Sequence, residues 1–180
     1  MNRGLLVGRF QPFHLGHLGL VSEIRRGRPD AELLLVIGSA EASYTWTNPF
    51  TAGERFEMAD RAIREAGVSG VPILPLADIQ RHAQWVSYVE SMVPRFDRVY
   101  TNNPLTRLLF ETAGHPVEGT PLLHRNKFEG AHIRDCLAAD RGWRPLVPPA
   151  VAEYLSELGA PARLELLRPP AAPPAGAPAP

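Results

Sequence analysis

Residues Leu33 to Ile37 form an unbroken run of five aliphatic side chains. A run that is apolar throughout is typical of a strand covered on both faces, whereas a half-exposed strand alternates apolar and polar residues. Four further segments are candidate strands: Leu5–Val7, Val71–Leu76, Arg98–Tyr100 and Pro116–Glu118. We therefore predict an α/β fold, a Rossmann-like doubly wound parallel sheet of about five strands with helices on both faces.

The segments between these runs have helical spacing. We expect helices at Leu15–Arg26, Thr51–Gly67, His82–Val93, Pro104–Phe110, Ala131–Ala139 and Pro149–Leu158. Thr51 and Glu54 have capping-box spacing, while Pro72 and Pro75 weaken the third strand. One domain over residues 1–168 follows, with a Pro/Ala-rich tail at residues 169–180 that we expect to be disordered.

Composition narrows the class of protein. The formal net charge is zero, which argues against a broad basic surface for nucleic acid or an anionic membrane, though not against a small phosphate pocket. The single cysteine, Cys136, excludes an internal disulfide framework. No stretch has the apolar length of a membrane span, and Leu5–Val7 is too short for a signal peptide, so we expect a cytoplasmic protein.

The segment from Gly8 to His17 lies between the first predicted strand and the first predicted helix. In a doubly wound sheet, ligands bind beyond the carboxyl ends of the strands, and helix N-termini attract anions. His14 and His17 can donate hydrogen bonds to phosphate, Arg9 adds a cation, and Gly16 lets a ligand approach the backbone. A metal pair or a solvated helix face are the alternatives for the histidines, but no nearby residue supplies a third metal ligand.

Gly8–His17 contains the sequence His-x-Gly-His and resembles the nucleotidyltransferase superfamily with that signature, in particular the archaeal-type nicotinamide mononucleotide adenylyltransferases. The resemblance continues through Gly38–Ala40, Pro49–Arg55, Phe96–Tyr100, Asn103–Leu105 and Arg125–Arg134. It spans roughly Arg3 to Leu158. It implies an enzyme that transfers a nucleotidyl group from ATP to nicotinamide mononucleotide and releases pyrophosphate, with Mg2+ as cofactor, as a homo-oligomer.

Carried onto this sequence, the resemblance implies three groups of site residues. The catalytic group is His14, His17 and Arg134. The nucleotide-binding group is Gly8, Arg9, Phe10, Gly16, Asn103, Arg125 and Gly130. The acceptor-binding group is Gly38, Ser39, Asp78, His82 and Trp85, and no protein residue is expected to bind a metal.

Plainer interpretations exist for several of these positions. Arg134 lies off the apolar stripe of its predicted helix and could be a surface cation. Trp85 could belong to the core instead of stacking on a nicotinamide ring, and Asp78 could be a turn residue. Outside the site groups, we expect Arg55 to be a surface or structural ion-pair residue. We expect Cys136 to be a small buried hydrophobic side chain.

Three positions depart from the archaeal pattern. Thr47 and His82 stand where those enzymes usually carry Arg and Asn, and Glu129-Gly130-Ala131 replaces Ser-Gly-Thr. The carboxylate of Glu129 would repel a polyanionic ligand and weaken its binding, unless the side chain turns outward or contacts Mg2+ or Lys127. The departures leave two alternatives open: a cytidylyltransferase or adenylyltransferase that takes CTP or ATP and a small phosphonate or phosphate, and a non-catalytic nucleotide sensor.

Overall fold

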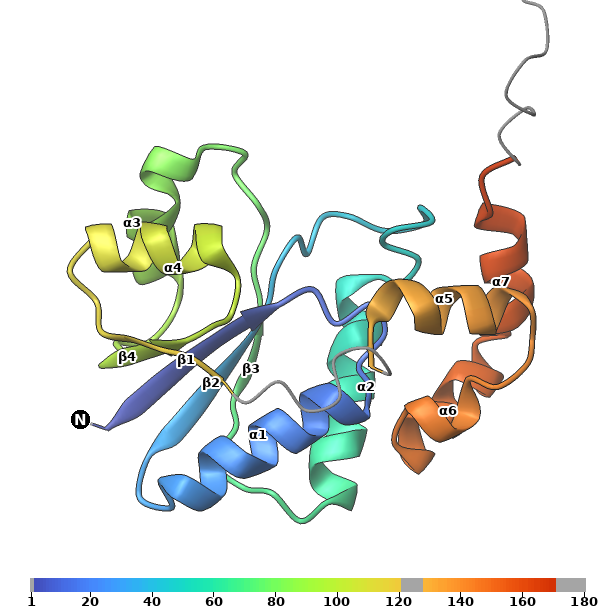
Figure 1. Ribbon diagram of the computed structural model, residues 1–180, viewed down its shortest axis with the longest axis horizontal. Helices are drawn as coiled ribbons and strands as arrows, with labels where there is room; N and C mark the ends of the chain where they lie inside the picture. The colour runs from blue at the N-terminus through green and yellow to red at the C-terminus, as the bar shows by residue number, and fades with distance from the viewer. Residues whose placement is uncertain (1, 121–127, 171–180) are drawn as a thin grey trace, which may run out of the picture.

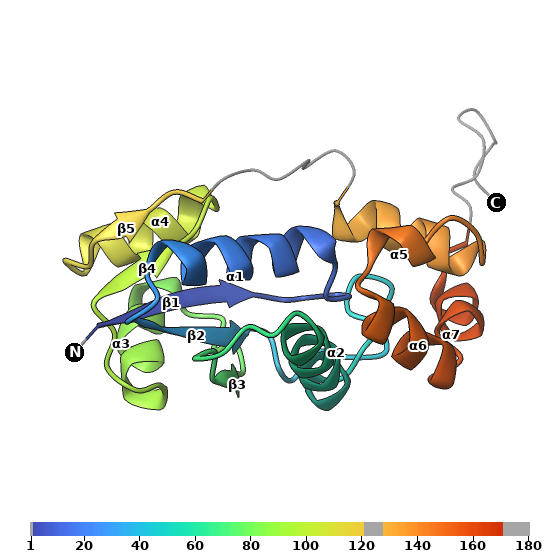
Figure 2. The same ribbon diagram turned by 90° about the horizontal axis from the view of Figure 1, so that it is seen from below.

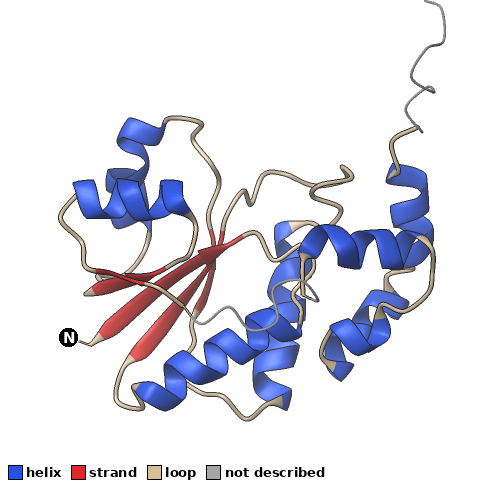
Figure 3. Ribbon diagram, viewed as in Figure 1, coloured by secondary structure: helices blue, strands red, loops and turns tan. Residues whose placement is uncertain are grey.

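The computed structural model describes residues 2–120 and 128–170, and the predicted strands pair as one parallel sheet. The strands are β1 (Arg3–Gly8), β2 (Glu32–Ile37), β3 (Ile73–Pro75), β4 (Arg98–Tyr100) and β5 (Val117–Glu118). Their spatial order is β3-β2-β1-β4-β5, and every neighbouring pair is parallel (Figure 3). The order reverses between β1 and β4, which is where such sheets bind ligands.

Helices cover both faces of the sheet, as the continuous apolar run of β2 predicts. Helices α1 (Leu15–Gly27) and α2 (Ala52–Glu65) lie on one face, and α3 (His82–Met92) and α4 (Pro104–Thr112) lie on the other (Figure 1). Leu33 and Leu35 of β2 contribute to the first core cluster, and Leu34 and Val36 to the second. The predicted α/β fold with helices on both faces is confirmed.

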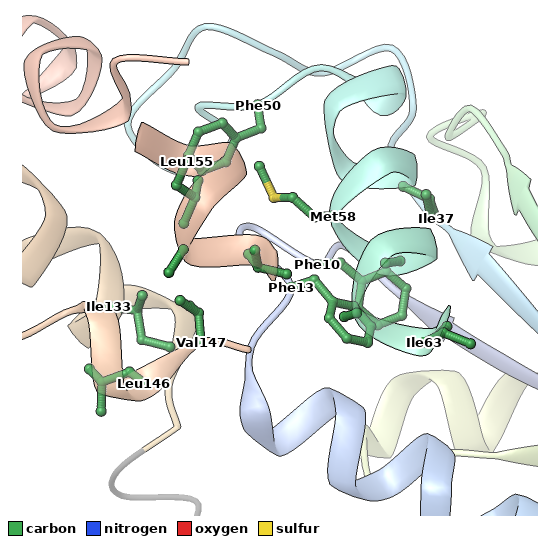
Figure 4. Packing of buried hydrophobic residues seen from close by; sticks show 14 of the residues in the cluster. Phe10, Phe13, Ile37, Phe50, Met58, Ile63, Ile133, Leu146, Val147 and Leu155 are labelled. Atoms are coloured by element: carbon green, nitrogen blue, oxygen red, sulfur yellow. The ribbon is translucent and has the colours of Figure 1, made fainter. Parts of the chain in front are cut away.

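Beyond the carboxyl ends of the strands lie the C-terminal helices α5 (Gly130–Ala138), α6 (Pro149–Glu157) and α7 (Ala160–Leu167), with a short 3-10 turn at Arg144–Leu146 (Figure 2). Phe10, Phe13 and Phe50, from the loops that follow β1 and β2, belong to the same buried cluster as Met58 of α2 and residues of these helices (Figure 4). The C-terminal helices therefore pack against the loops at the carboxyl ends of the strands, which is the edge of the sheet where we expect the ligand.

Two local predictions can be compared directly with the structure. The capping box at the start of α2 is confirmed, because Glu54 Oε2 accepts the backbone N–H of Thr51 and the Thr51 hydroxyl accepts that of Glu54. Strand β3 is only three residues long and lies at the edge of the sheet, where the missing N–H groups of Pro72 and Pro75 are tolerated. Helix α7 was not predicted, because its eight residues are too few to show a clear helical period.

Arg163 of α7 secures the start of α2. Its Nη1 lies 2.7 Å from Glu54 Oε2 and 3.4 Å from the carbonyl oxygen of Pro49, and its guanidinium lies 5.3 Å from the centre of the Tyr44 ring. Burial alone would raise the pKa of Glu54, but hydrogen bonds from Arg163 and from the Thr51 backbone hold that pKa below its ordinary value of 4.5. The pair thus joins the C-terminal helix to the loop that leads into α2.

We expect Arg163→Met to lower the urea midpoint at about pH 7, and the deficit to shrink as the pH falls below the ordinary pKa of Glu54. A carboxylate with a depressed folded pKa contributes stability above its unfolded pKa and loses it as the pH falls through the folded value. Urea titrations at a series of pH values measure this. Arg64→Met is the control, because Arg64 is exposed and pairs with Asp60 on the same helix. A deficit independent of pH would contradict the role given to Glu54.

Candidate active site

A pocket of about 350 Å3 lies at the carboxyl ends of the strands, at the switch point between β1 and β4. Its lining comes from the loops after four strands, so segments far apart in the sequence converge there. Predicted site residues that line it are Gly8, Arg9, Gly38, Ser39, Asp78, His82, Trp85 and Asn103. The volume falls in the range of small-molecule and cofactor sites.

His14 and His17 form the N-terminal cap of α1. The backbone N–H of His17 donates to Nδ1 of His14, and the backbone N–H of His14 donates to Nδ1 of His17, each at 3.3 Å. This is a capping box in which imidazoles take the parts usually played by Ser or Thr and Glu. The two rings stack with their centres 3.5 Å apart and 18° between their planes.

Both imidazoles are neutral at physiological pH. Burial lowers the pKa of His14 to about 4, and burial together with the nearby His14 holds the pKa of His17 well below its ordinary value. Because each Nδ1 accepts a backbone hydrogen bond, the single proton of each neutral ring is on Nε2. The cap therefore leaves two Nε2–H donors at a helix N-terminus, a place that favours anions.

Arg9 and Arg134 place two cations at the same end of the sheet. Arg134 of α5 is 7% exposed, and its Nη1 donates to the carbonyl oxygen of Gln11 at 3.0 Å. Burial, followed by the positive charge of Arg9, lowers the pKa of Arg134. Among the described residues, neither Arg9 nor Arg134 forms an ion pair with a carboxylate. Two like charges kept together in this way are suited to a polyanionic ligand.

The small and aromatic residues of the first loop have packing roles. A Cβ atom on Gly16 would come within 2.9 Å of Phe128 Cβ, and one on Gly130 within 3.2 Å of Arg134 Nη1. The Phe10 ring is buried, and a Cβ on Gly8 would meet it at 2.7 Å. Gly16 therefore lets Phe128, just before α5, approach the start of α1, and Gly130 leaves room for the Arg134 guanidinium beside the Gln11 carbonyl. The buried ring of Phe10 leaves only its backbone for a ligand.

Trp85, Asp78 and His82 line the far side of the pocket. Trp85 is half-buried, with its ring edge-to-face against Phe110 at 5.4 Å, so it contacts the core while still lining the pocket. The Asp78 carboxylate accepts the backbone N–H of Gln80, as a turn residue does, and also lines the pocket. The core contact of Trp85 and the turn role of Asp78 are therefore present, and the acceptor-binding role of each stays a prediction.

Asn103 lines the pocket, whereas the predicted site residues Phe10, His14, Gly16, His17, Gly130 and Arg134 do not. Asn103 caps α4 by accepting the backbone N–H of Thr106 at 3.0 Å. Glu129 and Thr47 are exposed, and Cys136 is half-buried with its sulfur 3.7 Å from Nε2 of His132. Arg125 and Lys127 lie outside the described residues, as do residues 171–180 of the tail. Within the described ranges, no cluster of His, Cys, Asp and Glu could hold a metal ion, and no helix is long and apolar enough to cross a membrane.

Two residues of the site were missed from the sequence. Gln11 exchanges two buried hydrogen bonds with the backbone of Phe50, at 2.9 and 3.0 Å, and so joins the loops after β1 and β2. The prediction that Arg55 is a surface or ion-pair residue is wrong, because Arg55 is fully buried and its partners are carbonyl oxygens. The available signal was its place on the apolar face of α2, in line with Met58, Ala59 and Ala62.

A doubly wound sheet with a pocket at its switch point, an imidazole-capped helix after its first strand and two neighbouring guanidiniums defines an α/β protein of the nucleotide-binding class. The sequence model of the cytidylyltransferase-like family matches residues 5–135. A nicotinamide-nucleotide adenylyltransferase of Methanolobus tindarius is 44% identical over 92% of this chain and 94% of its own, and one of Archaeoglobus fulgidus is 47% identical over 87% and 91%. The chain therefore belongs to the cytidylyltransferase-like family, on its nicotinamide-nucleotide adenylyltransferase branch.

Solved structures share the fold at low identity. A bifunctional NMN adenylyltransferase/ADP ribose pyrophosphatase of Francisella tularensis, complexed with AMP and a manganese ion, superposes with a TM-score of 0.78 at 19% identity over 92% of this chain. The chain spans about half (51%) of that protein. A putative nicotinate-nucleotide adenylyltransferase of Vibrio parahaemolyticus gives 0.64 at 18% identity, over 93% of this chain and 98% of its own.

We expect wild-type protein to lose stability as the pH falls from about 6.5 toward about 4, and His14→Asn to lose less. The folded state keeps His14 neutral down to a pKa of about 4, whereas the unfolded chain protonates it near 6.5, so its stabilisation is complete above 6.5 and fades below. The loss can reach about 3 kcal/mol. Asn keeps a capping oxygen that does not titrate.

Urea unfolding over this pH range measures the effect, and His132→Asn, at an exposed histidine of α5, is the matched control. Parallel pH profiles for wild type and His14→Asn would show that His14 is not held neutral by folding.

Proposed function

We propose that this protein transfers the adenylyl group of ATP to the phosphate of nicotinamide mononucleotide, giving NAD and pyrophosphate. The observation that carries the proposal is the set of donors that follows the carboxyl end of β1: two neutral imidazoles at the start of α1, and Arg9, whose charge acts on the buried Arg134. Among the described residues, neither arginine pairs with a carboxylate. The names of the relatives in Methanolobus and Archaeoglobus support the same reaction.

The reaction needs no protein nucleophile. An oxygen of the acceptor phosphate attacks the α-phosphorus of ATP, the bond from that phosphorus to the α,β-bridging oxygen breaks, and pyrophosphate leaves with the electron pair. A phosphate monoester is largely dianionic at neutral pH, so no base is required. Catalysis then consists of alignment and of stabilising the charge that develops on the phosphoryl oxygens.

The proposed roles follow from the donors available. His17 and His14 hold the transferring phosphates through Nε2–H, with His17 as the main stabiliser of the transition state. Arg134 and Arg9 neutralise the β- and γ-phosphates. Gly8, Phe10, Gly16, Asn103, Arg125 and Gly130 complete the nucleotide-binding group. Because His14 and His17 are uncharged, the attraction for the triphosphate comes from the guanidiniums, and the histidines contribute directed hydrogen bonds.

The acceptor is proposed to occupy the side of the pocket formed by Gly38, Ser39, Asp78, His82 and Trp85. The exposed part of the Trp85 ring offers an apolar face for a flat nicotinamide ring. Asp78 puts a carboxylate near a ring that carries positive charge in this substrate. Thr47 and Glu129 are exposed. We therefore attribute the departures from the archaeal pattern at these two positions to local changes and not to a new class of acceptor.

Mg2+ and self-association complete the proposal. Since the described residues contain no three-ligand cluster, Mg2+ would enter on oxygens of the nucleotide phosphates, where it supplies positive charge to the leaving pyrophosphate. Assembly into a homo-oligomer is proposed by likeness to the family, and sedimentation of the purified protein measures it.

Pyrophosphate release with Mg2+ tests the function. ATP or CTP is paired with nicotinamide mononucleotide and with a panel of small phosphonates and phosphates. We expect turnover with ATP and nicotinamide mononucleotide. Turnover only with CTP or a phosphonate would replace the proposal by the cytidylyltransferase alternative, and ATP binding without turnover on any pair would make the protein a sensor.

We expect His17→Ala to lower kcat by about 100-fold or more, with a smaller change in the KM for ATP, because a donor aimed at developing charge acts mainly in the transition state. Steady-state kinetics with ATP and nicotinamide mononucleotide measure this. His115→Gln, near the start of β5 and outside the lining of the pocket, is the control. A turnover number near that of wild type would remove His17 from its proposed role.

We expect Trp85→Leu to raise the KM for nicotinamide mononucleotide by about tenfold through lost stacking, while the KM for ATP changes little. The two substrates serve as internal controls for each other in one kinetic experiment. An equal rise in both KM values, or in neither, would place Trp85 in the core and remove it from the acceptor site.

A further inference from the structure

Arg55 lies beneath the loops that follow β1 and β2 and is fully buried. Its Nη1 donates to the carbonyl oxygens of Arg9 at 3.0 Å and of Gly38 at 2.9 Å, and its Nη2 donates to that of Ser39 at 3.0 Å. We infer that Arg55 is a positioning residue, which sets the phosphate-binding loop and the acceptor loop in their working relation without touching substrate. The inference rests on the proposed nucleotidyl transfer.

The arrangement of the acceptors explains why this residue is an arginine. The three carbonyl groups belong to two loops that are separate in sequence, and Nε reaches a fourth, that of Thr51, at 3.2 Å. A planar guanidinium presents five N–H groups in a fixed fork, whereas a lysine ammonium presents three donors from one point. A lysine keeps the charge at this position but cannot hold both loops at once.

The held carbonyl groups belong to segments with unusual backbone geometry. Ser39 has φ of 49° and Phe10 has φ of 51°, so both residues lie in the left-handed region, which is costly for residues other than glycine. Arg55 binds the carbonyl group of Ser39 and the carbonyl group of the peptide bond between Arg9 and Phe10. Its hydrogen bonds therefore fall at the points where each loop needs support.

Arg55 also interacts electrostatically with the proposed site. None of the ion pairs among the described residues includes Arg55. Burial lowers the pKa of its guanidinium, Glu41 opposes that effect, and the positive charge of Arg9 adds to it. The charge of Arg9 lowers the pKa of Arg134 as well, so Arg9 repels both buried guanidiniums. A polyanion bound over Arg9 would offset the repulsion of Arg9 with Arg55 and with Arg134.

The test compares Arg55→Lys and Arg55→Met with Arg64→Met, which removes an exposed arginine from the same helix. Each variant is assayed below its melting temperature, and rates are expressed per folded molecule. We expect Arg55→Met to lose about 100-fold in kcat/KM, with higher KM values for both substrates, and Arg55→Lys to keep part of the activity. Arg64→Met is expected to match wild type.

A second comparison separates positioning from simple support of the core. Ser39→Gly and Ser39→Ala both remove the hydroxyl, but only glycine adopts a positive φ at no steric cost. If Arg55 holds this backbone, Ser39→Gly in the Arg55→Lys background recovers several-fold more kcat/KM than Ser39→Ala does. With Arg55 intact, the kcat/KM values of Ser39→Gly and Ser39→Ala differ by less. If Arg55 only filled the core, glycine and alanine at position 39 would give equal kcat/KM values in the Arg55→Lys background.

Titration calorimetry with ATP and Mg2+ keeps this result separate from the proposed function. A wild-type protein that binds ATP without releasing pyrophosphate defeats the function, while weaker ATP binding in the Arg55 variants still supports positioning. The inference is overturned if the Arg55 variants keep kcat/KM and ATP affinity within about threefold of the Arg64→Met control. It is also overturned if glycine and alanine at position 39 have equal effects in the Arg55→Lys background. A third contrary result is an Arg55→Lys protein that does not fold even at low temperature.

Discussion

All five strands run in the same direction, and the site depends on this constraint. Parallel strands deliver every carboxyl end to one edge of the sheet, so the loops after β1, β2, β3 and β4 meet there although they are far apart in sequence. The C-terminal helices close over that edge, and Arg134 enters from α5 (Figure 2). The edge also collects positive charge, since Arg9, Arg55 and Arg134 come from three different segments and form no ion pairs with carboxylates among the described residues.

The protein holds these cations in place with neutral partners. Carbonyl oxygens bind Arg55 and Arg134, and a carbonyl satisfies N–H groups without cancelling their charge. Several other arginines pair with carboxylates, as Arg163 does with Glu54 and Arg98 with Glu118. The carbonyl partners of Arg55 and Arg134 leave the positive charge at this edge of the sheet uncancelled by the bonds that hold it.

The architecture could be predicted because its signals are local. The apolar run at Leu33–Ile37 gives a strand covered on both faces, and the spacing of Thr51 and Glu54 gives a helix start. The burial of Arg55 could have been inferred from its place on the apolar face of α2. The carbonyl partners of Arg55 and the backbone partners of Gln11 could not, because they belong to distant loops that no side-chain pattern reveals. Helix α7 escaped because eight residues carry too little periodicity, and it is held by tertiary contacts such as that of Arg163 with Glu54.

The imidazole cap of α1 gives one pair of hydrogen bonds two consequences, because it begins the helix and fixes the tautomer of both rings. In the proposed reaction, selection for stability and selection for turnover therefore act on the same two side chains. Serine and aspartate are stronger helix caps than most residues, yet either would abolish an Nε2–H donor. A laboratory search for heat-resistant variants should thus find its gains elsewhere in the chain, and this position marks a point where robustness and activity cannot be improved independently.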